Sequence, residues 1–163
     1  MHAKPDLRVV LKWTITRSGS VIADVIRLNE RSQMTQPDFI NDKDSATFAP
    51  FDLIDCRNQE WADLRLCFGD WDWLREKHGS DEIDGYYLNG YGVQGLVLAC
   101  RVNAGLDAFA EGIEPNSEGD TCYIHFPNLE SAVETARLAR DMICNTDNLK
   151  NMIKVAREND LED

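Results

Sequence analysis

The chain has 163 residues and is strongly acidic: 29 Asp and Glu residues outweigh 17 Lys and Arg residues, which gives a net charge of -12 at pH 7. Hydrophobic residues make up 43% and charged residues 28%, a balance typical of a folded soluble domain and not of a disordered chain. The negative field disfavours nucleic acid and anionic membranes as partners and favours a basic protein, although the same charge also serves solubility alone.

Cysteine usage indicates a reducing compartment. The five cysteines are Cys56, Cys67, Cys100, Cys122 and Cys144, an odd number without a CxxC pair or the Cys/His spacing of a zinc site. We therefore expect buried, reduced thiols. No segment approaches the roughly 18 consecutive apolar residues of a membrane span, and the N-terminus lacks the apolar core of a signal peptide, so we expect a cytoplasmic protein.

The N-terminal part of the chain predicts a β-hairpin followed by a loop. Residues 7–16 (LRVVLKWTIT) and 21–28 (VIADVIRL) are rich in β-branched residues and flank the turn sequence RSGS. Residues 29–50 are polar, contain Pro37 and offer few apolar anchors. This composition predicts a long surface loop.

Two further strands and a short helix are predicted next. Residues 51–55 and 64–68 (LRLCF) have the composition of strands. In the segment that follows, Asp70 is a suitable N-cap and Gly79 a suitable C-terminal residue for the helix WDWLREKH. Trp73 lies off the apolar face of this helix, so we expect its side chain to be partly exposed.

The central stretch contains a turn, a helix, a loop and a strand. Three Tyr and three Gly in residues 85–92 indicate a turn with positive φ angles, and Asn89 is a suitable cap for a helix after it. Apolar residues of 93–100 recur at helical spacing, although their β-branched content leaves a strand as the alternative. Residues 111–120 (EGIEPNSEGD) predict an acidic loop, and residues 121–126 (TCYIHF) alternate as in a sheet strand.

Two C-terminal helices complete the predicted fold. Asn128 caps a helix over residues 129–144, and apolar residues recur at helical spacing again over residues 149–156. Residues 158–163 are expected to fray. Together the elements predict a single α+β domain over residues 1–163, in which an antiparallel sheet of about four to six strands carries two to four helices on one face.

The sequence contains none of the common catalytic motifs. The spacing Gly90-x-Gly92-x-x-Gly95 matches part of a dinucleotide fingerprint but lacks the preceding βαβ frame, so we interpret it as a chance match. The carboxylate clusters match no calcium loop, and His125 has no nucleophile motif beside it. We predict no catalytic residue, no metal ligand and no cofactor.

A longer pattern extends over about residues 85–145. The tripeptide NGY at 89–91 precedes the apolar helix, EGIEPNSEG at 111–119 leads into CYIHF at 122–126, and a long amphipathic helix follows. This order resembles the immunity protein 51 family, whose members are predicted antidotes of bacterial polymorphic toxin systems. The resemblance implies a small α+β protein without an active site that neutralises a cognate toxin by direct binding.

Under this hypothesis the partner is a cognate toxin domain, which is often basic when the toxin acts on nucleic acid, and an acidic surface would speed association with it. The expected contact residues are carboxylates and aromatic side chains, namely Trp73, Asp81, Glu82, Asp84, Tyr86, Tyr87, Tyr91, Glu111, Glu114, Glu118 and Asp120. Two alternatives remain open. One is a small enzyme or ligand-binding domain with a pocket between helix and sheet near Glu118, Asp120 and His125; the other is an oligomeric adaptor.

Overall fold

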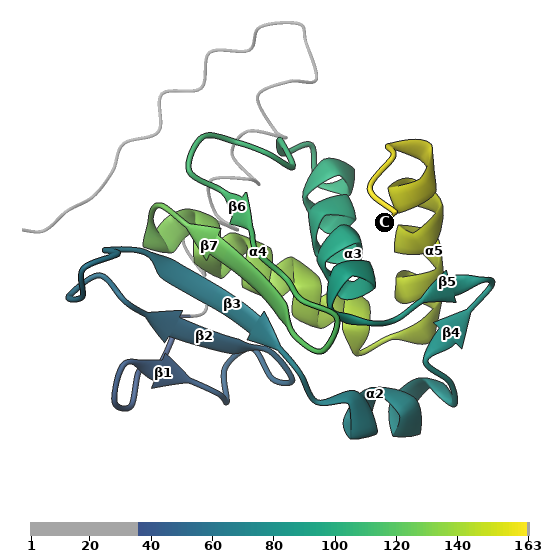
Figure 1. Ribbon diagram of the computed structural model, residues 1–163, viewed down its shortest axis with the longest axis horizontal. Helices are drawn as coiled ribbons and strands as arrows, with labels where there is room; N and C mark the ends of the chain where they lie inside the picture. The colour runs from purple at the N-terminus through teal and green to yellow at the C-terminus, as the bar shows by residue number, and fades with distance from the viewer. Residues whose placement is uncertain (1–35, 163) are drawn as a thin grey trace, which may run out of the picture. The chain divides into compact units, whose positions relative to one another are not determined.

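The computed structural model describes residues 36–162, and these form an α+β unit. The chain divides after Gln33, and the described residues all belong to the second unit, Met34–Asp163. They contain four helices, a five-stranded antiparallel sheet and a two-stranded sheet (Figure 1). The predicted α+β class is confirmed. The hairpin predicted over residues 7–28 lies outside the described residues, and the single domain over residues 1–163 stays a prediction.

The five-stranded sheet has the order β1-β2-β3-β7-β6, with every neighbouring pair antiparallel. Its strands are β1 (Lys43–Asp44), β2 (Asp52–Asp55), β3 (Leu64–Phe68), β6 (Glu114–Pro115) and β7 (Cys122–Phe126). The strands predicted at 51–55, 64–68 and 121–126 are thus confirmed. Along the central pair, Leu66 of β3 and Ile124 of β7 are opposite each other and fully buried, whereas Arg65 and His125 form the adjacent pair on the opposite face.

The helices are α2 (Trp71–His78), α3 (Gly90–Asn103), α4 (Leu129–Ile143) and α5 (Thr146–Glu158). The side chains of Asp70, Asn89 and Asn128 accept hydrogen bonds from first-turn N–H groups, so all three predicted N-caps are confirmed. Helix α4 packs on β3 and β7, α3 packs on β7, and α5 packs on α3 and α4. Figure 1 shows α4 behind β7 and β3, which leaves the other face of the sheet toward the viewer. Within residues 36–162, no helix combines the length and hydropathy that a membrane span requires.

Three glycines of α3 allow other parts of the backbone to approach this helix closely. A Cβ atom added at each would lie far inside contact distance of a main-chain oxygen: 1.8 Å from that of Glu118 for Gly90, 1.9 Å from that of Tyr87 for Gly92, and 2.2 Å from that of Leu161 for Gly95. The glycine spacing that resembles a dinucleotide fingerprint therefore has a packing origin. Through it, α3 is held by the strand just before it and by two segments that are distant in sequence.

The surface loop predicted over residues 29–50 is mostly exposed in its described part, but it contains order that was not predicted. Residues 43 and 44 form β1, and Phe48 is buried in the core. The buried Asp44 carboxylate accepts hydrogen bonds from three backbone N–H groups at 2.9–3.0 Å. Burial opposes ionisation, but hydrogen bonding by the Thr47 side chain and by these backbone groups outweighs it and lowers the pKa of Asp44. Burial of Phe48 and the hydrogen bonds of Asp44 therefore order a segment whose average composition is polar.

The tail over residues 158–163, which we expected to fray, makes contacts with the rest of the unit as far as residue 162. The N–H of Leu161 donates to the carbonyl of Ala156 at 2.9 Å, and Arg157 pairs with Glu162 at 2.9 Å. The Leu161 side chain packs against the core while its carbonyl lies over Gly95. Burial of one leucine and the space left by one glycine keep the end of the chain in place.

Candidate functional site

The first part of the site is a hairpin directly before α3. Strands β4 (Glu82–Ile83) and β5 (Tyr86–Tyr87) pair in antiparallel fashion. The two residues between them, Asp84 and Gly85, have φ angles of 54° and 78°, the left-handed geometry of a tight two-residue hairpin turn. The structure therefore has a hairpin within the segment in which we expected only a turn. The Asp-Gly pair was the sequence signal for it.

The second part is the turn between β6 and β7, which lies against the N-terminus of α3. Gly90 N–H donates to the carbonyl of Gly119 at 3.1 Å, and Glu118 pairs with Thr121 across the turn. The indole N–H of Trp71, at the start of α2, donates to the carbonyl of Asp120 at 2.7 Å. The start of α2, the β4–β5 hairpin and the turn at residues 118–121 thus converge on the first turn of α3.

Carboxylates and tyrosines are exposed where these segments meet. Tyr87 and Tyr91 are 60% and 39% exposed. We use the name acidic surface for the exposed residues Asp81, Glu82, Asp84, Tyr87, Tyr91, Glu118 and Asp120. None of its five carboxylates forms an ion pair with a Lys, Arg or His of the described chain. The surface therefore carries uncompensated negative charge beside aromatic rings.

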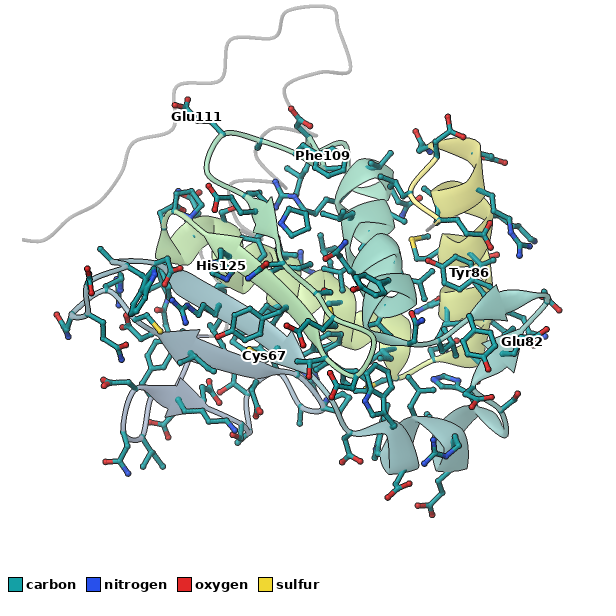
Figure 2. The ribbon with its side chains drawn as sticks, viewed as in Figure 1. Cys67, Glu82, Tyr86, Phe109, Glu111 and His125 are labelled. Atoms are coloured by element: carbon teal, nitrogen blue, oxygen red, sulfur yellow. The ribbon has the colours of Figure 1, made fainter. Side chains whose placement is uncertain are left out.

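Four predicted contact residues lie outside this surface. Tyr86 is buried, with its hydroxyl donating to the Gly92 carbonyl at 2.8 Å, so its prediction as a contact residue is wrong. Trp73 is half-buried and packs edge-on against Phe68 in the core. The remaining two, Glu111 and Glu114, are exposed but lie elsewhere: Glu114 is the first residue of β6, and Glu111 precedes this strand. Figure 2 shows Glu111 on the opposite side of the unit from Glu82.

His125 lies apart from the place where the alternative pocket near Glu118, Asp120 and His125 was expected. His125 points to the sheet face opposite α3 and α4, because it alternates with the buried residues Ile124 and Phe126. His125 follows Asp120 by five residues, which corresponds to a separation of about 16 Å along an extended strand. These three side chains therefore do not line one cavity between helix and sheet.

His125 instead belongs to a cluster that the sequence did not reveal. We call it the open-face cluster, and its members are Trp61, Asp63, Arg65, Tyr123 and His125. The Asp63 carboxylate contacts Arg65 Nε at 2.9 Å and His125 Nδ1 at 2.8 Å. Arg65 Nη1 donates to the Tyr123 hydroxyl at 3.2 Å, and the guanidinium carbon lies 5.6 Å from the Trp61 ring centroid and 5.8 Å from that of Tyr123.

Electrostatics in this cluster favour a fixed ion pair rather than a reactive group. Hydrogen bonds from Arg65 to Tyr123 and Asp63 raise the pKa of Arg65, and burial raises the pKa of Tyr123. His125 Nε2 is buried and has no hydrogen-bond partner among residues 36–162. Since this nitrogen is closed off from solvent and the other ring nitrogen is held by Asp63, the imidazole has no free atom with which to act on a substrate.

The described residues offer no group of three or more His, Cys, Asp or Glu side chains arranged to hold a metal ion. All five cysteines are free, and four are buried. Burial raises the pKa of Cys67, Cys100 and Cys122 to about 12, which keeps these thiols protonated and unreactive at neutral pH.

The chain matches no family model, no curated protein and no solved structure. A functional assignment therefore depends on the resemblance in residues 85–145 and on the geometry of the acidic surface.

Proposed function

We propose that this chain is an immunity-type protein that neutralises a cognate bacterial toxin domain by binding it directly through the acidic surface. The observation that carries the proposal is a group of five exposed carboxylates without an ion pair in the described chain, on the same converging segments as the exposed rings of Tyr87 and Tyr91. Tyrosine supplies contact area at low entropic cost, and aromatic residues are enriched among interface hot spots. Unpaired carboxylates supply complementarity to a basic surface.

Rigidity supports the same proposal. The hairpin and the turn at residues 118–121 are held by backbone contacts at Gly92 and Gly90, and Trp71 ties the same turn to α2. A surface that is already ordered loses little conformational entropy on binding, so more of its interaction energy becomes affinity.

Long-range charge supports it as well. A net charge of -12 attracts a basic toxin domain before contact, and such steering raises association rates by one to three orders of magnitude at low ionic strength. An acidic protein that covers a groove built for nucleic acid blocks the toxin without any chemistry of its own.

The test is coexpression with the toxin domain encoded beside this chain, followed by kinetic binding measurements on the purified pair. The double variant Glu82→Lys/Glu118→Lys should reduce the association rate by at least about tenfold and weaken rescue of growth. The matched control is Glu111→Lys/Glu158→Lys, which makes the same change in net charge at exposed positions elsewhere.

The control variant should retain rescue and most of the association rate. Equal losses in the two double variants would mean that net charge alone matters and would remove the acidic surface from the contact. If the wild-type chain gives neither rescue nor a complex, the immunity function itself is rejected.

A further inference from the structure

We propose that Arg157 of α5 is the positioning residue of the acidic surface: it holds the β4–β5 hairpin in the shape that the toxin domain contacts. The identity of this partner rests on the proposed function, whereas the effect on the hairpin rests on the contacts of one guanidinium. Arg157 Nη2 donates to the carbonyl oxygen of Asp84, in the turn between β4 and β5, at 3.1 Å. Figure 1 shows the hairpin beside α5, and the hydrogen bond joins residues 73 positions apart in the sequence.

The hairpin turn gains from this contact because its own pairing is short. Strands β4 and β5 have two residues each, and an isolated two-stranded hairpin is marginally stable at best. Asp84 has a φ angle of 54°, a left-handed conformation that few residues with a side chain adopt, although Asp adopts it more readily than most. The hydrogen bond from Arg157 therefore fixes the carbonyl of the residue that reverses the chain.

Arg157 contacts the hairpin at two further points. Its guanidinium carbon lies 5.9 Å from the ring centroid of Tyr86, a distance at which a cation and an aromatic ring attract each other. A Cβ atom added at Gly85 would lie 3.8 Å from Arg157 Nη2, so the guanidinium lies directly beside the turn. Since the Tyr86 hydroxyl donates to the Gly92 carbonyl at 2.8 Å, the hairpin is held by α3 through Tyr86 and by α5 through Arg157.

Glu162 holds the guanidinium in this position. Its carboxylate accepts hydrogen bonds from Arg157 Nε at 2.9 Å and from Nη2 at 3.2 Å, the two-pronged geometry that arginine can form and lysine cannot. The charge of Arg157 is thereby paired with a carboxylate outside the acidic surface. The hairpin gains a fixed contact, while Asp81, Glu82 and Asp84 stay without an ion pair in the described chain.

Charge and position predict opposite effects of replacing Arg157, so the two can be separated. Arg157→Gln removes one positive charge from a chain of net charge -12, which strengthens attraction to a basic partner and should not lower the association rate. The same change removes the contacts that order the hairpin. The complex must then restrain a looser surface, so its dissociation rate should rise.

Binding kinetics with the toxin domain test the inference. Arg157→Gln should raise the dissociation rate by at least about fivefold, a factor typical of losing the net contribution of one hydrogen bond. Arg157→Lys keeps the charge but not the planar fork of donors, so its rate should fall between those of Arg157→Gln and the wild type. The matched control is Arg137→Gln, which removes the same charge from an exposed residue paired with Asp141 of its own helix, and should dissociate like the wild type.

The dissociation rate separates positioning from overall stability. A variant that folds less well has a smaller fraction of binding-competent molecules, but the molecules that do bind dissociate at the wild-type rate. A wild-type dissociation rate in Arg157→Gln would therefore overturn the inference.

Hydrogen exchange on the free chain gives a check that does not need the toxin domain. Amides of residues 82–87 should exchange faster in Arg157→Gln than in the wild type, whereas those of β3 should be unchanged. Unchanged exchange in the hairpin would also overturn the inference. If the wild-type chain binds no toxin domain, the proposed function is rejected, while hydrogen exchange still decides whether Arg157 orders the hairpin.

Discussion

At the residue scale, His78 joins the end of α2 to the junction between α4 and α5. Its Nε2 lies 2.9 Å from the carbonyl of Ile143, which only accepts, so this nitrogen carries the proton. Its Nδ1 lies 3.0 Å from the Thr146 hydroxyl, which donates to it in the neutral ring. Burial lowers the pKa of His78, although the hydrogen bond to the Ile143 carbonyl partly opposes this effect.

The lowered pKa of His78 predicts a specific pH dependence of folding. Because the unfolded chain takes up the proton more readily than the folded one, the free energy of unfolding should fall as pH drops below the ordinary histidine value of 6.5. The fall should level off once the folded-state pKa has been passed. Urea unfolding of the wild type and of His78→Gln over this range measures the effect. An unchanged pH profile in the variant would assign the dependence to other groups.

At the element scale, the glycine contacts of α3 predict a selective effect of adding one methyl group. Gly92→Ala would place a Cβ 1.9 Å from the Tyr87 carbonyl oxygen, a main-chain atom that cannot rotate away. We expect a loss of about 3 kcal/mol in the free energy of unfolding, the upper range for overpacking. The control is Gly119→Ala, where no atom lies within 4 Å and the change should stay within about 0.5 kcal/mol. Chemical denaturation of both variants gives the comparison.

Elements with strong local signals could be predicted from the sequence. Helix α2 has its Asp70 cap and its left-handed Gly79, and α4 has Asn128, so short-range chemistry determines where each begins or ends. Helix α3 was ambiguous with a strand because it is buried on nearly every side, which removes the amphipathic pattern that separates the two. The two-residue strands β4 and β5 were not predicted: Asp84-Gly85 is a local signal for the turn, but strands this short carry no alternating pattern, and the hairpin packs against α3.

The candidate site could be predicted only in part, because its geometry depends on distant contacts. The acidic loop was identified, yet only packing of Gly90 against the turn at residues 118–121 brings Glu118 near the β4–β5 hairpin. The open-face cluster requires the pairing of Arg65 with His125 between β3 and β7, which no local pattern encodes. The burial of Tyr86 likewise follows from tertiary packing, since tyrosine serves equally well in a core and at a surface.

At the scale of the whole molecule, negative charge is distributed unevenly. The acidic surface has unpaired carboxylates, whereas Asp52 and Asp63, on the side of the five-stranded sheet opposite α3 and α4, pair with Lys43 and Arg65. Negative charge is therefore less compensated at the acidic surface than on this side of the sheet.

This uneven distribution predicts how binding responds to salt. Screening weakens attraction between opposite charges, so higher ionic strength should slow association with a basic toxin domain. Stopped-flow association across a series of NaCl concentrations measures the effect. An association rate that does not fall as NaCl rises would contradict the assignment of the contact to the acidic surface.

The docked position of Leu161 affects how the protein is best purified. An affinity tag fused at the C-terminus would begin close behind a residue whose side chain packs on the core and whose carbonyl lies over Gly95. A bulky or strongly basic tag there would pull on this contact and on the nearby pair of Arg157 with Glu162. A flexible spacer before the tag, or removal of the tag by a protease before stability is measured, keeps the terminal segment in its native position.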